Sequence, residues 1–219
     1  MTLASNIAAP QSTRQGRFPI ILAMVLLAWL AVVAIAGRNG VFEAGPSRPP
    51  LPLLVAVVLP PALFALLYRL SDRVRDFALS LDLRLVTAMM AWRVIGVMFL
   101  VLYAFGMLPG LFAWPAGVGD FAVGLTAPFV VQTMIAESVG WERRVFWLNV
   151  AGLVDFVGAI ATGVLSSNSA IGVFASAAPT VSMGALPLSL IPTFAVPLWI
   201  VLHMIALIQL RRIDAGRHG

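Results

Sequence analysis

Hydrophobic residues occur in this chain as long runs that few charged side chains interrupt. A run of about 18 or more apolar residues is long enough, at ~1.5 Å per residue, to cross the hydrocarbon core of a bilayer as a helix. Six runs meet this criterion, and they cover residues 18–36, 51–68, 85–107, 111–135, 145–165 and 188–210. The pattern predicts an all-α protein, a polytopic bundle of six transmembrane helices that forms a single membrane domain over residues 1–219.

Two connecting segments have patterns of their own. Residues 69–84 interleave arginines and aspartates with apolar side chains, which is typical of a segment lying in the cytoplasmic interface of a membrane. Residues 171–186 hold no charged side chain. They are compatible with a re-entrant or interfacial segment, and equally with an external loop rich in serine and alanine.

Arginines are distributed unequally between the two ends of the predicted spans, and this distribution indicates orientation. With the N-terminus in the cytoplasm, only Arg38 and Arg48 fall outside. The cytoplasmic set is then Arg14, Arg17, Arg69, Arg73, Arg75, Arg84, Arg143, Arg144, Arg211, Arg212 and Arg217. An even number of spans places the C-terminus in the cytoplasm too. The sequence Ala-Ile-Ala at residues 34–36 resembles a signal-peptidase site, so cleavage of residues 1–36 stays an alternative.

Composition removes several classes of function. The chain is 61% hydrophobic and 11% charged, which exceeds the apolar share of an ordinary soluble domain. It has no cysteine and no lysine, which excludes disulfides, thiolate metal sites, lysine Schiff bases and Walker-type phosphate loops. The net charge of +5 comes from arginines that flank the spans, so it indicates topology rather than nucleic-acid binding. Membrane lipid is the expected partner, no cofactor is expected, and oligomerisation stays open.

Four ionisable side chains lie inside the apolar spans, namely Arg93, Asp120, Asp155 and His203. A charge near the centre of a bilayer costs roughly 3 kcal/mol on insertion scales, so such a side chain is expected to be paired inside the bundle. At helical spacing, Asp120 shares a face with Gly117 and Gly124, and Asp155 shares one with Gly152. Small residues allow helices to approach closely, so both carboxylates are expected to point at neighbouring helices.

The depth of each polar residue follows from its position along its helix. Arg93, His203 and Asp155 come out ~12, ~10 and ~15 Å from the cytoplasmic ends of their spans. This compatible depth predicts an ion pair between Arg93 and Asp155, with His203 close enough to modulate it. Asp120 lies only ~7 Å below the external end if its helix starts at the proline that precedes it, which predicts an outer layer shared with Tyr103 or the uncharged loop.

Three further polar residues are secondary candidates. At helical spacing, Tyr103 shares a face with Arg93, and Gln132 shares one with Asp120. Asn149 completes this set. No catalytic residue is expected, because the sequence contains neither H-E-x-x-H nor G-x-S-x-G. No metal site is expected either, because His203 and the two aspartates have suitable ligand types but no spacing signature.

Four short motifs carry a resemblance. They are Trp92-Arg93-Val94-Ile95-Gly96, Leu108-Pro109-Gly110, Pro115-Ala116-Gly117-Val118-Gly119-Asp120 and, in the last span, His203. On these motifs, roughly the last two thirds of the chain resembles a family of small bacterial polytopic integral membrane proteins of unassigned function. The resemblance implies a multi-pass protein of the bacterial inner membrane, and it implies no reaction or ligand.

The favoured functional hypothesis is a proton-linked transporter or channel for a small solute or ion. Asp155 would take and release a proton, and His203 would relay or tune it. Arg93 would hold the counter-charge or an anionic substrate, and Asp120 would gate the outer mouth. Two alternatives stay open. One is an intramembrane enzyme that acts on a lipid or isoprenoid with the two aspartates as catalytic carboxylates, and the other is a structural or accessory membrane subunit.

Overall fold

The computed structural model describes residues 18–43, 45, 49–175 and 180–218, and these residues form helices, turns and connections without a strand. Within them, six helical segments are long and apolar enough to cross a membrane. This confirms the predicted fold class, an all-α bundle of six spans. Three arginines that contribute to the predicted orientation lie outside the described residues, namely Arg14, Arg17 and Arg48.

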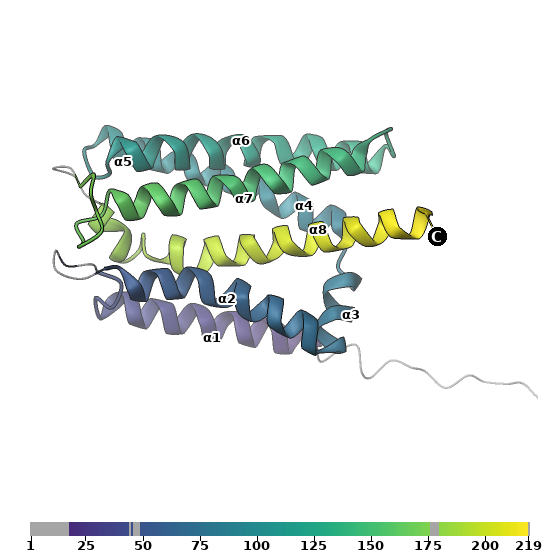
Figure 1. Ribbon diagram of the computed structural model, residues 1–219, viewed down its shortest axis with the longest axis horizontal. Helices are drawn as coiled ribbons and strands as arrows, with labels where there is room; N and C mark the ends of the chain where they lie inside the picture. The colour runs from purple at the N-terminus through teal and green to yellow at the C-terminus, as the bar shows by residue number, and fades with distance from the viewer. Residues whose placement is uncertain (1–17, 44, 46–48, 176–179, 219) are drawn as a thin grey trace, which may run out of the picture.

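The spans run back and forth along one bundle (Figure 1). Four of the spans are single long helices: α1 (Phe18–Arg38), α2 (Leu51–Leu70), α6 (Gly110–Ile135) and α7 (Trp141–Leu165). The last span begins with the π-helical turn η3 (Ile191–Ala195) and continues as the long helix α8 (Val196–His218). The third span joins α4 (Leu83–Met89), the 3₁₀ helix η1 (Met90–Val97) and α5 (Met98–Ala104). At α7 and α8 the helices extend beyond the predicted spans, because they continue through charged residues outside the apolar runs.

The third span buries a residue at every third position rather than at α-helical spacing. Met90, Arg93, Gly96 and Phe99 are all buried. In a 3₁₀ helix residues three apart lie one above the other, so η1 directs these side chains to the same side. The expectation that Tyr103 shares the face of Arg93 was therefore wrong, and the side chain of Tyr103 is exposed. The error came from applying the α-helical period to a segment that is not α-helical.

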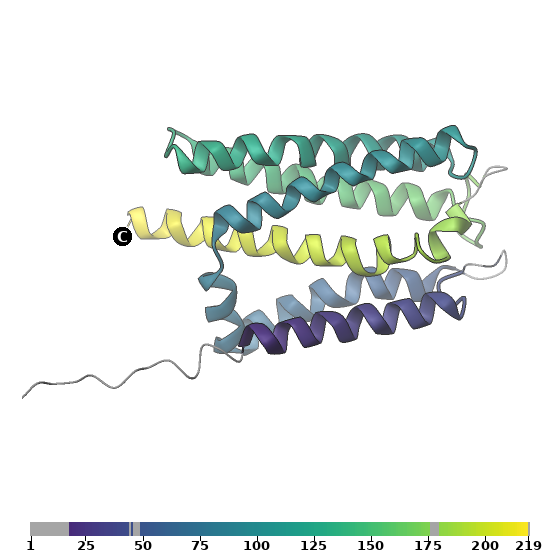
Figure 2. The same ribbon diagram turned by 180° about the vertical axis from the view of Figure 1, so that it is seen from behind.

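Figures 1 and 2 show the spans in layers, with α8 between the pair α1 and α2 and the group formed by α6, α7 and the third span. α6 packs against η1, α5 and α7, while both α7 and α2 pack against α8. One apolar cluster includes Met90, Val123 and Leu202, and a second includes Phe99 and Phe112. Arg93 follows Met90 and precedes Phe99 along the third span, so it lies between residues of the two apolar clusters.

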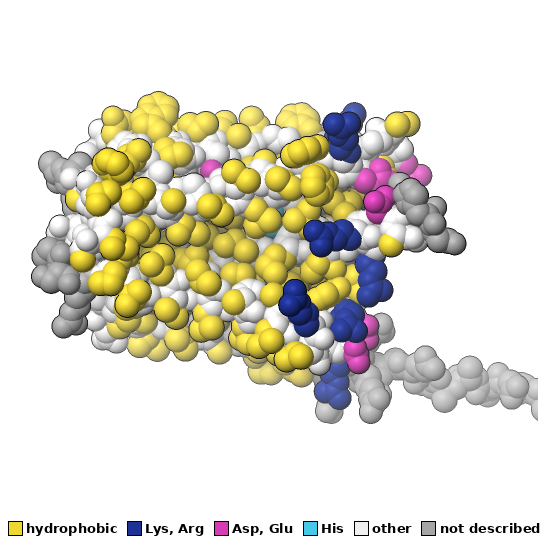
Figure 3. Space-filling view, viewed as in Figure 1, with side chains coloured by type: hydrophobic (Ala, Val, Ile, Leu, Met, Phe, Trp, Pro, Cys, Tyr) yellow, Lys and Arg dark blue, Asp and Glu magenta, His cyan; other side chains and the backbone are white. Residues whose placement is uncertain are grey.

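The two ends of the bundle differ in charge. Arginine side chains gather at one end of the face shown in Figure 3, and apolar side chains cover most of the rest. The helix α3 (Asp72–Ser80) runs across the spans at this end (Figure 1). Gln209 of α8 holds it there by donating hydrogen bonds to the carbonyl oxygens of Ala78 (2.7 Å) and Leu81 (2.9 Å). These bonds satisfy carbonyl groups that the end of a helix leaves unpaired.

The connection before α8 lies at the opposite end of the bundle. Its described part forms turns and a short 3₁₀ helix, η2 (Thr180–Gly184), while residues 176–179 lie outside the described residues. Met183 of η2 is buried and packs in the same apolar cluster as Phe112. The connection therefore covers one end of the space between α2, α6 and α7.

Candidate functional site

Four helices each bring one ionisable side chain to the middle of the bundle. Nε of Arg93 on η1 donates to Oδ1 of Asp120 on α6 at 2.7 Å, and its Nη2 donates to Oδ2 of Asp155 on α7. Its Nη1 lies 3.0 Å from Nε2 of His203 on α8. The predicted ion pair between Arg93 and Asp155 is therefore present. We call these four residues the polar cluster.

The guanidinium group of Arg93 is at the centre of the polar cluster. The side chain is fully buried, and each of its three nitrogens faces a different partner. Its central carbon lies 3.9 Å from the centroid of the Phe156 ring, a cation–π contact with the ring face. A planar guanidinium with several N–H donors can serve three acceptors at once, which the ammonium group of a lysine could not do in this geometry.

The hydrogen bonds of His203 fix which ring nitrogen carries its proton. A guanidinium group can only donate, so Nε2 of His203 accepts from Arg93. Nδ1 then carries the proton and donates to Oδ1 of Asn149 at 2.7 Å. The amide nitrogen of Asn149 in turn donates to the carbonyl oxygen of Val145 at 2.7 Å, which supports this orientation of the amide. In this arrangement the imidazole is neutral, and Asn149 is its positioning partner.

Glycines leave the space that the polar cluster occupies. A Cβ atom built on Gly152 would lie 2.6 Å from Nη1 of Arg93 and 2.5 Å from Cε1 of His203. A Cβ on Gly96 would collide with the side chain of Asp120, and one on Gly119 would collide with that of Asp155. The prediction that small residues turn both carboxylates toward neighbouring helices is therefore confirmed.

The expected position of Asp120 in an outer layer was wrong. The helix α6 begins at Gly110, so Pro115 lies inside the helix and not at its start. Asp120 is then about ten residues, or ~15 Å, into the helix, and this depth brings it level with Arg93. A proline is typical of the first turn of a helix, but a transmembrane helix tolerates an internal one.

The three secondary candidates lie in different places. Asn149 is buried and contacts His203 within the polar network. Tyr103 is exposed, with its ring centroid 6.2 Å from that of Trp114. Gln132 is also exposed, close to the far end of α6. Only Asn149 therefore belongs with the polar cluster.

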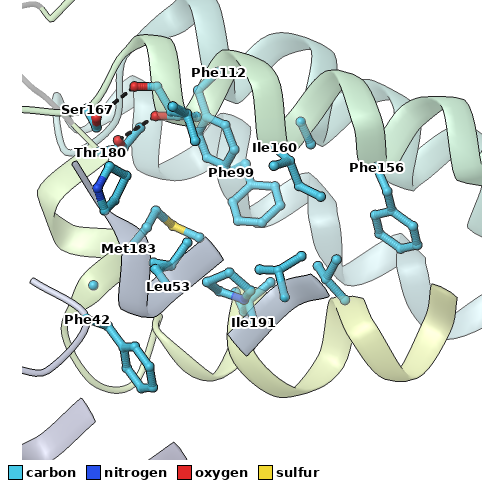
Figure 4. Close-up of a pocket in the computed structure, with 18 of the residues that line it drawn as sticks. Phe42, Leu53, Phe99, Phe112, Phe156, Ile160, Ser167, Thr180, Met183 and Ile191 are labelled. Carbon is cyan, nitrogen blue, oxygen red and sulfur yellow. Dashed lines mark hydrogen bonds between the residues drawn. The ribbon is translucent and has the colours of Figure 1, made fainter. Parts of the chain in front are cut away.

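A cavity of about 100 Å³ lies beside the polar cluster, between α2, α6, α7 and η3. Among the described residues that line it, Asp120 is the only charged one, and Phe42, Phe99, Phe112 and Phe156 contribute aromatic rings. Figure 4 shows Ser167, Thr180 and Phe42 toward one end of the space and Phe156 toward the other. The cavity thus extends from the connection before α8 toward the middle of the bundle.

Sequence reasoning did not identify the aromatic residues of this cavity. Phe99, Phe112 and Phe156 lie on three different helices, and hydrophobic runs give no sign of which apolar residues face an empty space. The period of three that places Phe99 on the face of Arg93 is visible in the burial pattern and not in the sequence, where residues 94–102 hold no polar side chain.

The described residues contain no group of three or more His, Cys, Asp or Glu side chains that could hold a metal ion. Asp120, Asp155 and His203 do converge, but they converge on the guanidinium group of Arg93. The cation at the centre of the polar cluster is therefore part of the chain itself.

Comparison with known proteins finds one family. The model of a domain of unknown function (DUF8737) matches residues 50–211, which include α2 and all four residues of the polar cluster and leave α1 outside. No curated protein and no solved structure matches the chain.

Proposed function

The chain belongs to the DUF8737 family, and we propose that it exchanges protons for a small solute across a bacterial inner membrane. The observation that carries this proposal is the charge count of the polar cluster. Two carboxylates, Asp120 and Asp155, face a single guanidinium group, and the hydrogen bonds of His203 require a neutral ring. With both carboxylates ionised, the polar cluster holds one negative charge too many.

An uncompensated charge inside an apolar bundle is unfavourable, so the polar cluster gains by binding one positive charge. A proton on either carboxylate supplies that charge, and so does a cation. Because Arg93 contacts both aspartates, neutralising one of them frees the guanidinium group to pair more closely with the other. The two carboxylates thus compete for one guanidinium group, so a change of charge on one alters the pairing of the other. This coupling is the basis for exchanging a proton for a solute.

The two carboxylates have different surroundings, which suggests different roles. Asp120 lines the cavity, so it is the carboxylate that meets the solute. Asp155 does not line it and contacts Nη2 of Arg93, so we assign the exchangeable proton to Asp155. His203 and Asn149 hold the guanidinium group in place through Nη1.

Arginine placement supports an orientation with both ends of the chain in the cytoplasm. Most described arginines belong to segments at the end of the bundle where α3 lies, and this end is shown in Figure 3. Arg38 ends α1 at the opposite end. Cytoplasmic loops carry an excess of arginine and lysine, so the cavity would open to the external side.

The buried position of the polar cluster favours exchange over an accessory-subunit role. Charges that pair with another protein would point outward, whereas Arg93 and His203 are fully buried. The side chains of Asp120 and Asp155 are only 11% and 12% exposed. All four residues thus interact within this chain.

Proton exchange can be measured with protein reconstituted in vesicles that contain a pH-sensitive dye. We expect at least one solute from a panel of amines, monocarboxylates, sugars and inorganic cations to move more protons in wild-type vesicles than in protein-free vesicles, which measure the passive flux of neutral amines and undissociated acids. Asp155→Asn should reduce this movement at least tenfold, by the loss of the exchangeable proton. Asp76→Asn, an exposed position on α3, is the matched control and should have no effect. No proton movement with any solute, or equal movement in Asp155→Asn, would contradict the proposal.

A second measurement does not depend on the solute or on the variant. At neutral pH, where exposed carboxylates are ionised, the wild-type protein should still show the infrared carbonyl band of a protonated carboxylic acid. Wild-type protein without such a band at neutral pH would contradict the charge argument directly.

A further inference from the structure

The walls of the cavity beside Asp120 combine a carboxylate with several aromatic rings. In the described part of its lining, the one charged group is the carboxylate of Asp120, and the largest side chains are the rings of Phe42, Phe99, Phe112 and Phe156. The rings of Phe99 and Phe112 meet edge to face with centroids 5.3 Å apart. Aromatic faces carry negative partial charge, so these walls favour a cation with an apolar part over an anion.

Two hydroxyl groups at the outer end of the cavity, beside the amide of Asn168, can accept hydrogen bonds more readily than donate them. The hydroxyl group of Thr180 donates to the carbonyl oxygen of Gly163 at 2.9 Å. The hydroxyl group of Ser167 donates to the carbonyl oxygen of Val164 at 2.7 Å. Both protons are therefore engaged, and what these side chains present to a ligand is lone pairs. An ionised Asp120 likewise only accepts.

The positive charge of Arg93 does not oppose a cation in this space. Arg93 is fully buried and is not among the residues that line the cavity, and its guanidinium group packs against a face of Phe156. Arg93 together with the two ionised aspartates carries a net charge of about −1, so a cation in the cavity is attracted overall. Binding of the cation then supplies the positive charge that a proton supplies in its absence.

We infer that the cavity binds a small primary alkylammonium ion, with its ammonium group at Asp120 and its alkyl chain among the phenylalanine rings. Size sets the upper limit, because about 100 Å³ is less than the ~150 Å³ of an engineered apolar cavity that holds benzene. A cation of a few heavy atoms, such as propylammonium, meets this limit. The transport part of this inference rests on the proposed proton exchange, whereas binding itself does not.

Calorimetric titration of the detergent-solubilised protein tests the binding step. We expect propylammonium to bind, and we expect 1-propanol, butyrate and the bulky tetrapropylammonium to bind at least tenfold more weakly. Propylammonium should also bind more weakly at low pH, where protons occupy the carboxylates. If 1-propanol binds as tightly as propylammonium, the ligand need not be a cation and the inference is overturned. If butyrate binds more tightly than propylammonium, the site prefers an anion, which also overturns the inference.

Two variants locate the site. Asp120→Asn should weaken propylammonium binding at least tenfold by removing the charge. Ala159→Leu fills the cavity from a position outside the polar cluster and should have an effect of similar size. Its matched control is Ala161→Leu on the exposed side of α7, which should change binding less than twofold. Binding that survives Ala159→Leu would place the ammonium ion elsewhere and overturn the inference, even if Asp120→Asn fails to fold.

The vesicle assay separates this inference from the proposed function. Propylammonium binding at Asp120, combined with no proton movement for any solute of the panel, would leave the binding site standing and contradict proton exchange. Protons moved only by solutes of other classes, without propylammonium binding, would support exchange and overturn the ammonium site.

Discussion

The pair α1 and α2 and the other four spans are stabilised in different ways. In the most apolar part of each span, 11% of the residues of α1 and 6% of those of α2 are buried inside the protein. The corresponding share is 33% in the third span, in α6 and in the last span, and 22% in α7. The first pair therefore buries fewer of its residues than the other four spans, although α2 also packs against α8.

This difference shows where the chain specifies one arrangement. Apolar side chains facing lipid gain little from any particular neighbour, because lipid tails are as apolar as they are. Buried polar groups have far fewer acceptable partners, and Arg93 finds them on three other helices at once. The four spans that meet at Arg93 thus have a defined relative position, while α1 contacts the rest mainly near η3, where Trp29 meets Phe194 with ring centroids 4.7 Å apart.

The largest expected effect is the loss of the guanidinium group. Arg93→Met leaves Asp120 and Asp155 buried without their donor, and removing one partner of a buried ion pair typically costs about 3–5 kcal/mol. We expect little folded protein, measured as the monodisperse fraction in detergent and as the midpoint of thermal unfolding. The charge-neutral triple variant Arg93→Met, Asp120→Asn, Asp155→Asn should recover much of the loss. A triple variant no more stable than Arg93→Met would argue that packing of Arg93, and not charge, holds the four spans together.

A smaller loss of stability is expected when a single methyl group is added beside Arg93. Gly152→Ala places a Cβ within 2.6 Å of Nη1 of Arg93, and overpacking of this kind typically costs about 1–3 kcal/mol. Gly158→Ala is the matched control on the same helix, because a Cβ there meets nothing within 4 Å. Alanine also favours a helix by about 1 kcal/mol over glycine, so the control should raise the thermal midpoint while Gly152→Ala lowers it. Two shifts of the same sign would count against the close contact.

The spans and part of the polar cluster could be predicted from the sequence, and each prediction had its own physical basis. A span is a local property of a hydrophobic run, so six runs gave six spans. The pairing of Arg93 with Asp155 followed from the high cost of leaving either charge alone in hydrocarbon. That cost depends on the residue type and not on the details of the fold, so it could be used before the fold was known.

Errors arose where local geometry departed from the common case. Pro115 is inside α6, so Asp120 lies a turn and more deeper than a helix starting at the proline would place it. The 3₁₀ helix η1 changed which residues accompany Arg93, replacing Tyr103 by Phe99. The cavity could not be predicted at all, because its walls come from distant segments whose packing no run of residues encodes.

The smallest effect is expected for an exposed side chain of α2. Leu59 on α2 is 57% exposed, and Leu202 on α8 is 8% exposed and belongs to the apolar cluster near the polar residues. Leu59→Ala should change the free energy of unfolding by no more than about 0.5 kcal/mol, because its neighbours in the folded bundle are mainly lipid or detergent. Leu202→Ala leaves a cavity among packed helices and should cost about 2 kcal/mol or more. The measurement is unfolding of both variants in the same detergent. A loss at Leu59 equal to that at Leu202 would mean that α2 is held by specific packing, and the division of the bundle into a lipid-supported pair and a self-supported group of four would fail.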